Sequence, residues 1–392
     1  MAFTTGTSTD YADLLADVRT WLIGTAGWSS LAYTAVTQEA KVVAINVAGT
    51  GYAEDDTITL TGGTFATATV LTVTSIGGSG EITGISITTA GDYSVVPSNP
   101  VAQGSTSGSG VNATFTMTYN DSTGSLALQA PGNGTGKEVF INIETDYDDG
   151  GNTYAWKIFG ATGWVTGLAH GSQQGAGGPV FFNLWDNTID YWIFANDRRF
   201  ILIAQVGTNY MSMYAGFFLP FALGTEYPFP LAIIASYPEM ALPSVANARN
   251  AFIADPGEGA AKYRRRTSES WRDIENHQTS SSNHKPSVGQ RCFMWPYKTG
   301  RGFALGSDTA DNWNYGGIEK MVENHENESP LFQCHIIDML DDTVVGALEG
   351  VHATSGFNRS VEQVVTIDAQ DYILFQRVFR SNPGDFMAIE ET

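Results

Sequence analysis

The sequence is poor in cysteine and in basic residues, and both shortages exclude classes of protein. Two cysteines in 392 residues, Cys292 and Cys334, are too few for a disulfide framework. We expect two reduced, buried thiols, with a disulfide or a shared metal site as the alternatives. The 20 basic residues face 41 acidic ones, so the net charge is −21. Such a surface repels nucleic-acid phosphates and anionic lipid, and we expect no direct nucleic-acid partner.

Charge is also missing from one long stretch, because no Asp, Glu, Lys or Arg lies between Phe200 and Thr225. The stretch is long enough to span a bilayer, but polar residues and Pro220 interrupt it. Apolar segments lie on both sides of Asn196-Asp197, a pair that tolerates positive φ. This pattern favours a tight hairpin instead of a membrane span. We predict an antiparallel meander that is apolar on both faces and therefore central, with strands over Ile189–Ala195, Phe200–Val206 and from Tyr210 onward.

What the chain has in plenty is glycine, at 43 residues, and aromatics, at 12%. This mixture is typical of many short strands joined by turns. One helix is predicted at the N-terminus, capped by Ser8, Thr9 or Asp10. Apolar residues from Tyr11 to Leu22, including Trp21, follow helical spacing. We also expect short helices over 248–253 and 268–277, a helical turn over 316–325, a turn over 148–151, and a C-terminal hairpin joined around Ala369-Gln370.

A region rich in Thr, Gly and Ser separates two aromatic-rich parts of the chain. VAGTGY at 47–52 resembles TTAGDY at 88–93, and TATVLTV at 67–73 resembles NATFTMT at 112–118. Two copies of a β-unit too small for its own core would pack together. The predicted fold is mainly β: an antiparallel β-sandwich core with an N-terminal helix and an inserted small β-domain. The expected parts are 1–40, 41–122 and 123–392, of which 241–360 is poorly placed.

The motifs of common enzymes are missing: no P-loop, nucleotide-binding glycine fingerprint or nucleophile elbow occurs in a suitable context. Carboxylates gather near Glu54, Asp146 and Asp338. They suit Ca²⁺ or a glycosidase pair, but Asp is also favoured in turns, and we expect solvated turns. We therefore predict no catalytic, cofactor or metal site, and no enzyme.

One basic segment interrupts the acidic sequence. It is either a solvated loop or a surface that docks on acidic neighbours, because arginine binds carboxylates bidentately. Two aromatic residues of a proline-rich connector and one from the helix are further interface candidates. The full set is Lys262, Arg264, Arg265, Arg266, Arg272, Trp21, Tyr227 and Phe229.

Several stretches together resemble a known group of proteins. They are TDYADLLADVRTWL near the N-terminus, EVFINIETDYDDGGNTYAWKIFG, YWIFANDRRFILIAQVGTNYMSMYAGFFLPF with YPFPLAIIAS, and the ending DYILFQRVFRSNPGDFMAIEE. The chain resembles virion structural proteins of tailed bacteriophages, a group associated with tail and baseplate. The resemblance covers roughly 1–30, 125–240 and the last 30 residues, with 41–120 as an insertion.

The resemblance implies a structural or assembly role in the virion, without cofactors. The implied partners are other copies of the chain and other tail or baseplate proteins. The implied location is the virion, after synthesis in the host cytoplasm, since no signal peptide is visible. A host glycan-binding module is the alternative function, and a β-rich glycoside hydrolase is a third.

Overall fold

The computed structural model describes most residues of the chain. They are 2–132, 137–148, 152–235, 261–266, 270–274, 331–338, 343–354, 356, 358–376 and 386–391, with the backbone of 292–295. The predicted helices over 248–253 and 316–325 and the predicted turn over 148–151 lie wholly or mostly outside them. Two compact units result: residues 1–33 with 125–392, and residues 34–124. The predicted insertion, 41–122, falls within the second unit.

The first unit begins with a strand and the predicted helix. Helix α1 (Tyr11–Gly24) starts at Asp10, whose side chain accepts hydrogen bonds from the backbone N–H groups of Ala12 and Asp13. These bonds satisfy donors that the first helical turn leaves without partners. Tyr11, Leu14, Leu15, Val18 and Leu22 are buried on one face.

The middle sheet of this unit is antiparallel and contains the predicted meander. Its hairpin forms differently from the prediction, since neither Asn196 nor Asp197 has a positive φ. Instead, Asn196 Oδ1 accepts hydrogen bonds from the backbone N–H groups of Arg198 and Arg199, both 3.0 Å long. In spatial order the strands are β1 (Ala2–Ser8), β15 (Ile189–Ala195), β16 (Arg199–Val206), β17 (Asn209–Phe217), β19 (Leu231–Ile234), β20 (Ala261–Arg264) and β21 (Arg272–Asp273).

Two further antiparallel sheets belong to the same unit. The helix-side sheet consists of β14 (Gly177–Leu184), β13 (Thr153–Ala161), β12 (Phe140–Asp148), β11 (Ser125–Gln129) and β2 (Ser29–Thr34). The C-terminal sheet consists of β22 (Cys292–Trp295), β23 (Phe332–Asp338), β24 (Thr343–Thr354), β27 (Phe386–Glu390), β26 (Gln370–Gln376) and β25 (Val364–Ile367), and β18 (Leu219–Pro220) pairs with β24. A short 3₁₀ helix, η1 (His170–Ser172), precedes β14.

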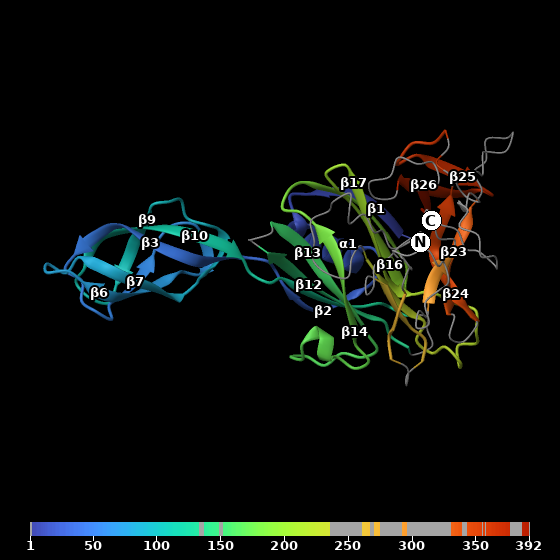
Figure 1. Ribbon diagram of the computed structural model, residues 1–392, viewed down its shortest axis with the longest axis horizontal. Coiled ribbons are helices and arrows are strands. Elements are labelled where there is room, and N and C mark those ends of the chain that lie inside the picture. The colour runs from blue at the N-terminus through green and yellow to red at the C-terminus, as the bar shows by residue number, and fades with distance from the viewer. Residues whose placement is uncertain are drawn as a thin grey trace, which may run out of the picture. The chain divides into compact units, whose positions relative to one another are not determined.

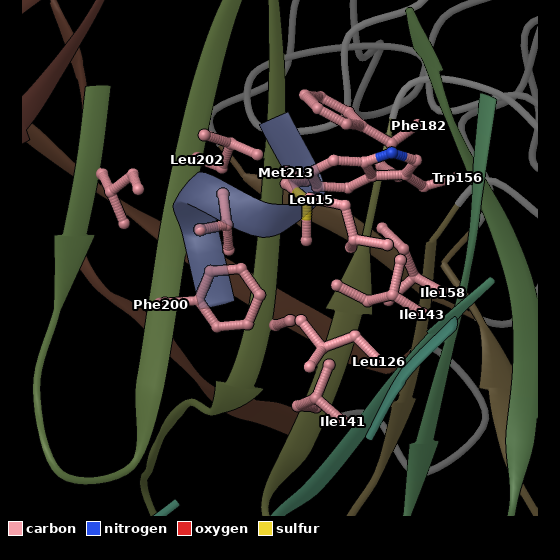
Figure 2. Packing of buried hydrophobic residues seen from close by; sticks show 14 of the residues in the cluster. Leu15, Leu126, Ile141, Ile143, Trp156, Ile158, Phe182, Phe200, Leu202 and Met213 are labelled. Carbon is pink, nitrogen blue, oxygen red and sulfur yellow. The ribbon is translucent and has the colours of Figure 1, made fainter. Parts of the chain in front are cut away.

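The centre of the middle sheet is buried on both faces because β15, β16, β17 and β19 are mostly apolar along their length. Alternate side chains point to opposite sides of a strand. Phe200 and Leu202 join α1 and the helix-side sheet in one core, and Ile201 and Ile203 join the C-terminal sheet in another. Figure 2 shows the first core, where Leu15 of α1 meets side chains of the helix-side and middle sheets. The central position predicted for the meander is confirmed.

The second unit is built from strands alone (Figure 1). Its eight-stranded sheet runs β5 (Thr64–Thr67), β8 (Asp92–Val95), β3 (Gln38–Thr50), β10 (Val111–Asp121), β9 (Val101–Thr106), β4 (Thr57–Leu60), β6 (Val70–Ile76) and β7 (Ile82–Thr89). Its core is small and mostly aliphatic, with Ile58, Leu71 and Phe115 among the fully buried side chains.

Strand pairing in the second unit has two-fold symmetry. The pairing of β3 with β10 corresponds to the pairing of β7 with β6. The pairing of β10 with β9 corresponds to that of β6 with β4. In the centre, β9 and β4 pair with each other. Exchanging the first half (β3, β4, β6) for the second (β7, β9, β10) leaves this pattern unchanged. Each half therefore obtains a neighbouring strand from the other, as two small copies that share one core would.

The halves also share a local device. Tyr52 and Tyr93, at equivalent places in the repeated text, are both buried. Gly49 (φ +62°) and Gly91 (φ +82°) come shortly before them. A Cβ on either glycine would collide with the ring of its tyrosine. Each of the two positions therefore requires glycine for two reasons: its backbone is left-handed, and the tyrosine ring packs too closely for a side chain.

The prediction of a mainly β chain with antiparallel sheets is confirmed. The helix expected over 268–277 is wrong for its described part, since Arg272–Asp273 forms β21 beside β20. Pairing with a neighbouring strand outweighed a weak local preference for helix. The C-terminal hairpin predicted around Ala369 is confirmed, and Asp368 and Ala369 adopt positive φ at its turn.

Candidate functional site

The basic segment, predicted to be a solvated loop or a docking surface, is largely engaged within the chain. Arg265 is 1% exposed and its Nη2 lies 3.6 Å from Oδ2 of Asp338, on β23 of the C-terminal sheet. Arg272 also pairs with this oxygen, and the hydroxyl of Tyr263 donates to it at 2.6 Å. Two arginines and a tyrosine of the middle sheet thus hold one carboxylate of the neighbouring sheet, and Asp338 is not on the solvated turn that we expected.

The other interface candidates also have contacts inside the chain. Arg264 Nη1 donates to the carbonyl of Gly175 at 3.0 Å, and Lys262 pairs with Asp273. Arg266 is exposed, although its guanidinium lies over the ring of Tyr227. Tyr227 is buried, and Trp21 and Phe229 pack against the first core. A docking role for these residues stays a prediction, and of the five basic side chains Arg266 is the one classed as exposed.

A second carboxylate with two arginines joins the same pair of sheets. Glu349 of β24 accepts hydrogen bonds from Arg198 Nε and Nη2 at 2.9 and 2.6 Å, and Arg199 Nε lies 3.9 Å away. Burial alone would raise the pKa of Glu349, but the bonds from Arg198 and the charges of both arginines hold it below its usual value. Because Arg199 is fully buried, the nearby carboxylate helps to stabilise its charge.

The remaining acidic clusters have ordinary surroundings. Glu54 and Asp55 form a turn, as predicted, and Asp56 Oδ2 accepts the backbone N–H of Ala53 at 2.9 Å. Asp146 lies on β12 and pairs with Lys157 at 2.8 Å. In the described part of the chain no group of three or more His, Cys, Asp or Glu is placed to hold a metal ion.

The two cysteines are in different positions of one sheet. Cys334 is a free, buried thiol, and burial raises its pKa to about 12. In the backbone register Cys292 stands opposite Asp338, four residues from Cys334. At roughly 3.3 Å per residue, the two backbones are too far apart for a disulfide.

A polar cluster with aromatic neighbours lies on the outer face of the helix-side sheet. On β12, Ile141 and Ile143 point into the first core, so Asn142 and Glu144 point to the opposite face. His170 of η1 covers this face, with its Nδ1 3.2 Å from Glu144 Oε1. Its ring contacts the rings of Phe159, at 6.0 Å, and Trp164, at 5.9 Å. Phe159 stands opposite Asn142 in the strand register.

The two polar side chains of β12 in this cluster differ, because Glu144 has a polar partner and Asn142 has none among the described residues. The contact with His170 lowers the pKa of Glu144, against the effect of burial and with help from the charge of Lys157. His170 Nδ1 nevertheless has no hydrogen-bond partner among the described residues. Asn142 is 0% exposed, and among the described residues neither its Nδ2 nor its Oδ1 has a partner. A buried amide in this state is unusual in native proteins.

Sequence reasoning did not single out these residues, although a signal exists. INIE, at residues 141–144, alternates apolar and polar residues, which places Asn142 and Glu144 on the face away from the core. Trp164 and His170 lie in a Gly-rich region between strands, and nothing local shows that they fold back over β12 and β13. Only the tertiary structure brings them together.

Three exposed apolar side chains lie on the segment that follows β18 and on β24, with which β18 pairs. Phe221, Leu223 and Val344 are 55%, 71% and 45% exposed. The backbone N–H of Phe221 donates to the carbonyl of Val345, next to Val344. Leu223 is held by its carbonyl, which accepts from the backbone N–H groups of Glu226 and Tyr227. We call these three side chains the β18–β24 strip.

No protein-family model matches the chain, and no curated protein matches it. Among the helices in the described residues, none has the length and apolar character to cross a bilayer.

Proposed function

We propose that the chain is a structural component of a tailed-bacteriophage virion, in the tail or baseplate, and that it acts by docking to other subunits. The sequence resemblance motivates the role. The β18–β24 strip is the observation that carries it, because large apolar side chains grouped on a surface mark contact sites. In this proposal the core is an extended β-sandwich, in which the helix-side and C-terminal sheets pack on the two faces of the middle sheet and hold the strip in place.

The partners in this proposal are further copies of the chain and neighbouring tail or baseplate proteins. Copies that each carry a net charge of −21 repel one another at long range. Apolar docking between them should therefore strengthen as salt screens the repulsion. Docking of arginine on acidic residues should instead weaken with salt, so the salt dependence separates the two modes.

The test is sedimentation of the purified chain over a range of concentration and salt, with electron microscopy of the particle. We expect association that grows with salt and is lost in Leu223→Asp. Leu168→Asp is the matched control, because Leu168 is also an exposed loop leucine, at 46%, away from the strip. A chain that stays monomeric in all conditions and is missing from the particle would refute the proposal.

A further inference from the structure

Asn142 points to a ligand that the chain does not itself provide. Its side chain is fully buried, and within the described structure neither polar atom finds a partner. Each unmet group costs about 1–3 kcal/mol, a cost that an apolar residue of similar size would not incur. Phe159, which stands opposite Asn142 in the strand register, is itself buried and shows that this face accepts an apolar residue. An amide here is therefore explained best by a partner from outside.

The surroundings define the chemistry of that partner. Lys157 is paired with Asp146, and Glu144 has a second oxygen beyond its contact with His170. The two carboxylates leave no excess of positive charge, which disfavours anions. The amide offers one donor group and one acceptor, and a hydroxyl group can satisfy both. The rings of Trp164 and Phe159 add apolar surface beside these polar atoms.

We propose that Asn142, Glu144, Phe159, Trp164 and His170 form a binding site for a neutral polyhydroxylated ligand of the size of one sugar unit. Hydroxyl groups would bond Asn142 and Glu144, and the ring face would lie against Trp164. This assignment goes beyond docking between subunits. It also gives the glycan-binding alternative a particular location in the fold.

Glu144, whose side chain is 30% exposed, and half-buried Trp164 are the members of the site that reach solvent, and in this proposal the ligand enters beside them. The covering loop is a self-contained body. Gln173 accepts from the N–H of Val165 at 2.7 Å and donates to the carbonyls of Val165 and Leu168. Its ends are closed by the bond from Thr162 N–H to the carbonyl of Gln174, 2.9 Å long. Arg264 and Trp271 both donate to the carbonyl of Gly175 and tether that end of the loop, so in this proposal the ligand displaces only the part around His170 and replaces its contact with Glu144.

The experiment measures binding of methyl glycosides of glucose, galactose and mannose to the full chain, by calorimetry and by the shift in unfolding temperature. At least one glycoside should bind and raise the unfolding temperature. Asn142→Leu should abolish this shift and raise the unfolding temperature of the free chain, because it removes two unmet groups. Trp164→Ala should weaken binding about ten-fold or more, as the loss of about 1.4 kcal/mol of contact implies.

Asn183→Leu is the matched control. Asn183 is also a buried asparagine, and it lies on the same sheet face opposite Ala155, but it has a partner in the chain. This variant should destabilise the chain and leave the glycoside shift in place. The site is refuted if no glycoside binds, or if Asn142→Leu and Trp164→Ala both bind as the unmodified chain does. Binding of putrescine or inorganic phosphate in place of the glycosides would refute the ligand class.

Discussion

The middle sheet of the first unit and the duplicated second unit reach an antiparallel β-structure by different routes. β15, β16 and β17 bury large side chains on both faces, so their stability comes from two cores at once. The second unit, described in full, has a small core and, among its polar residues, only Thr69 is buried. Its glycine-rich halves share strands instead. A β-fold can thus bury enough surface either with large apolar residues on both faces of a sheet or by pairing the strands of two similar halves around one core.

The largest contrast should come from the buried charges, which only the first unit contains among its described residues. Glu349→Ala leaves Arg199 buried without its carboxylate, and breaking such a pair costs about 3–5 kcal/mol. Calorimetry should show an earlier unfolding transition for the first unit and an unchanged one for residues 34–124. Asp146→Ala removes a partly exposed pair and should cost at most about 1 kcal/mol. Equal effects of the two variants would contradict the contrast.

Core truncation separates the units more directly. Leu202→Ala in the middle sheet and Leu71→Ala in the second unit each remove a fully buried leucine, at a cost of about 2–5 kcal/mol. Each should lower only the transition of its own unit in calorimetry. A single transition that moves as a whole in both variants would show that the units do not unfold separately.

Acid should act on the first unit through His352. Burial lowers its pKa from the usual 6.5 to about 4, so between these values the unfolded chain binds the proton more readily. Stability is therefore full above pH 6.5 and falls as the pH drops to about 4. The loss approaches about 3 kcal/mol, at 1.36 kcal/mol per pKa unit. Urea unfolding across this range should show the loss, and His352→Leu should reduce it; an unchanged slope in His352→Leu would contradict this origin.

The smallest effects should test the symmetry of the second unit. Gly49→Ala and Gly91→Ala both force an alanine into a left-handed backbone against a tyrosine ring, which costs about 1–3 kcal/mol. Gly78→Ala is the control, because a Cβ there meets nothing within 4 Å. Thermal unfolding should show similar losses for the first two and almost none for the control. A loss confined to one half would show that the two halves are not equivalent.

Much of the fold was readable from the sequence because its signals are local. The helix cap at Asp10, the apolar meander and the C-terminal hairpin each depend on residues close together in the chain. Strands β1 and β9 were missed because they are polar and exist through pairing with distant strands. The repeat was readable, although its inward residues align from Leu71 to Phe115, an offset of 44, not the 45 suggested by the quoted text.

The sites were harder to read, because they depend on partners from separate sheets. The run of arginines indicated an exposed basic surface. Nothing in the neighbouring sequence indicates that these side chains instead pair with Asp338 or donate to the carbonyl of Gly175. Asn142 and Glu144 belong to a recognisable outward face, but Trp164 and His170 reach it only after the chain folds back.

Hydrogen exchange of the intact chain, followed by mass spectrometry, tests most directly whether the middle sheet is buried on both faces. Peptides from residues 189–217 should exchange more slowly than any other described part of the first unit, and far more slowly than residues 162–176. Exchange of 189–217 as fast as that of the loop would show that one face of the sheet is open to water, and would contradict the account.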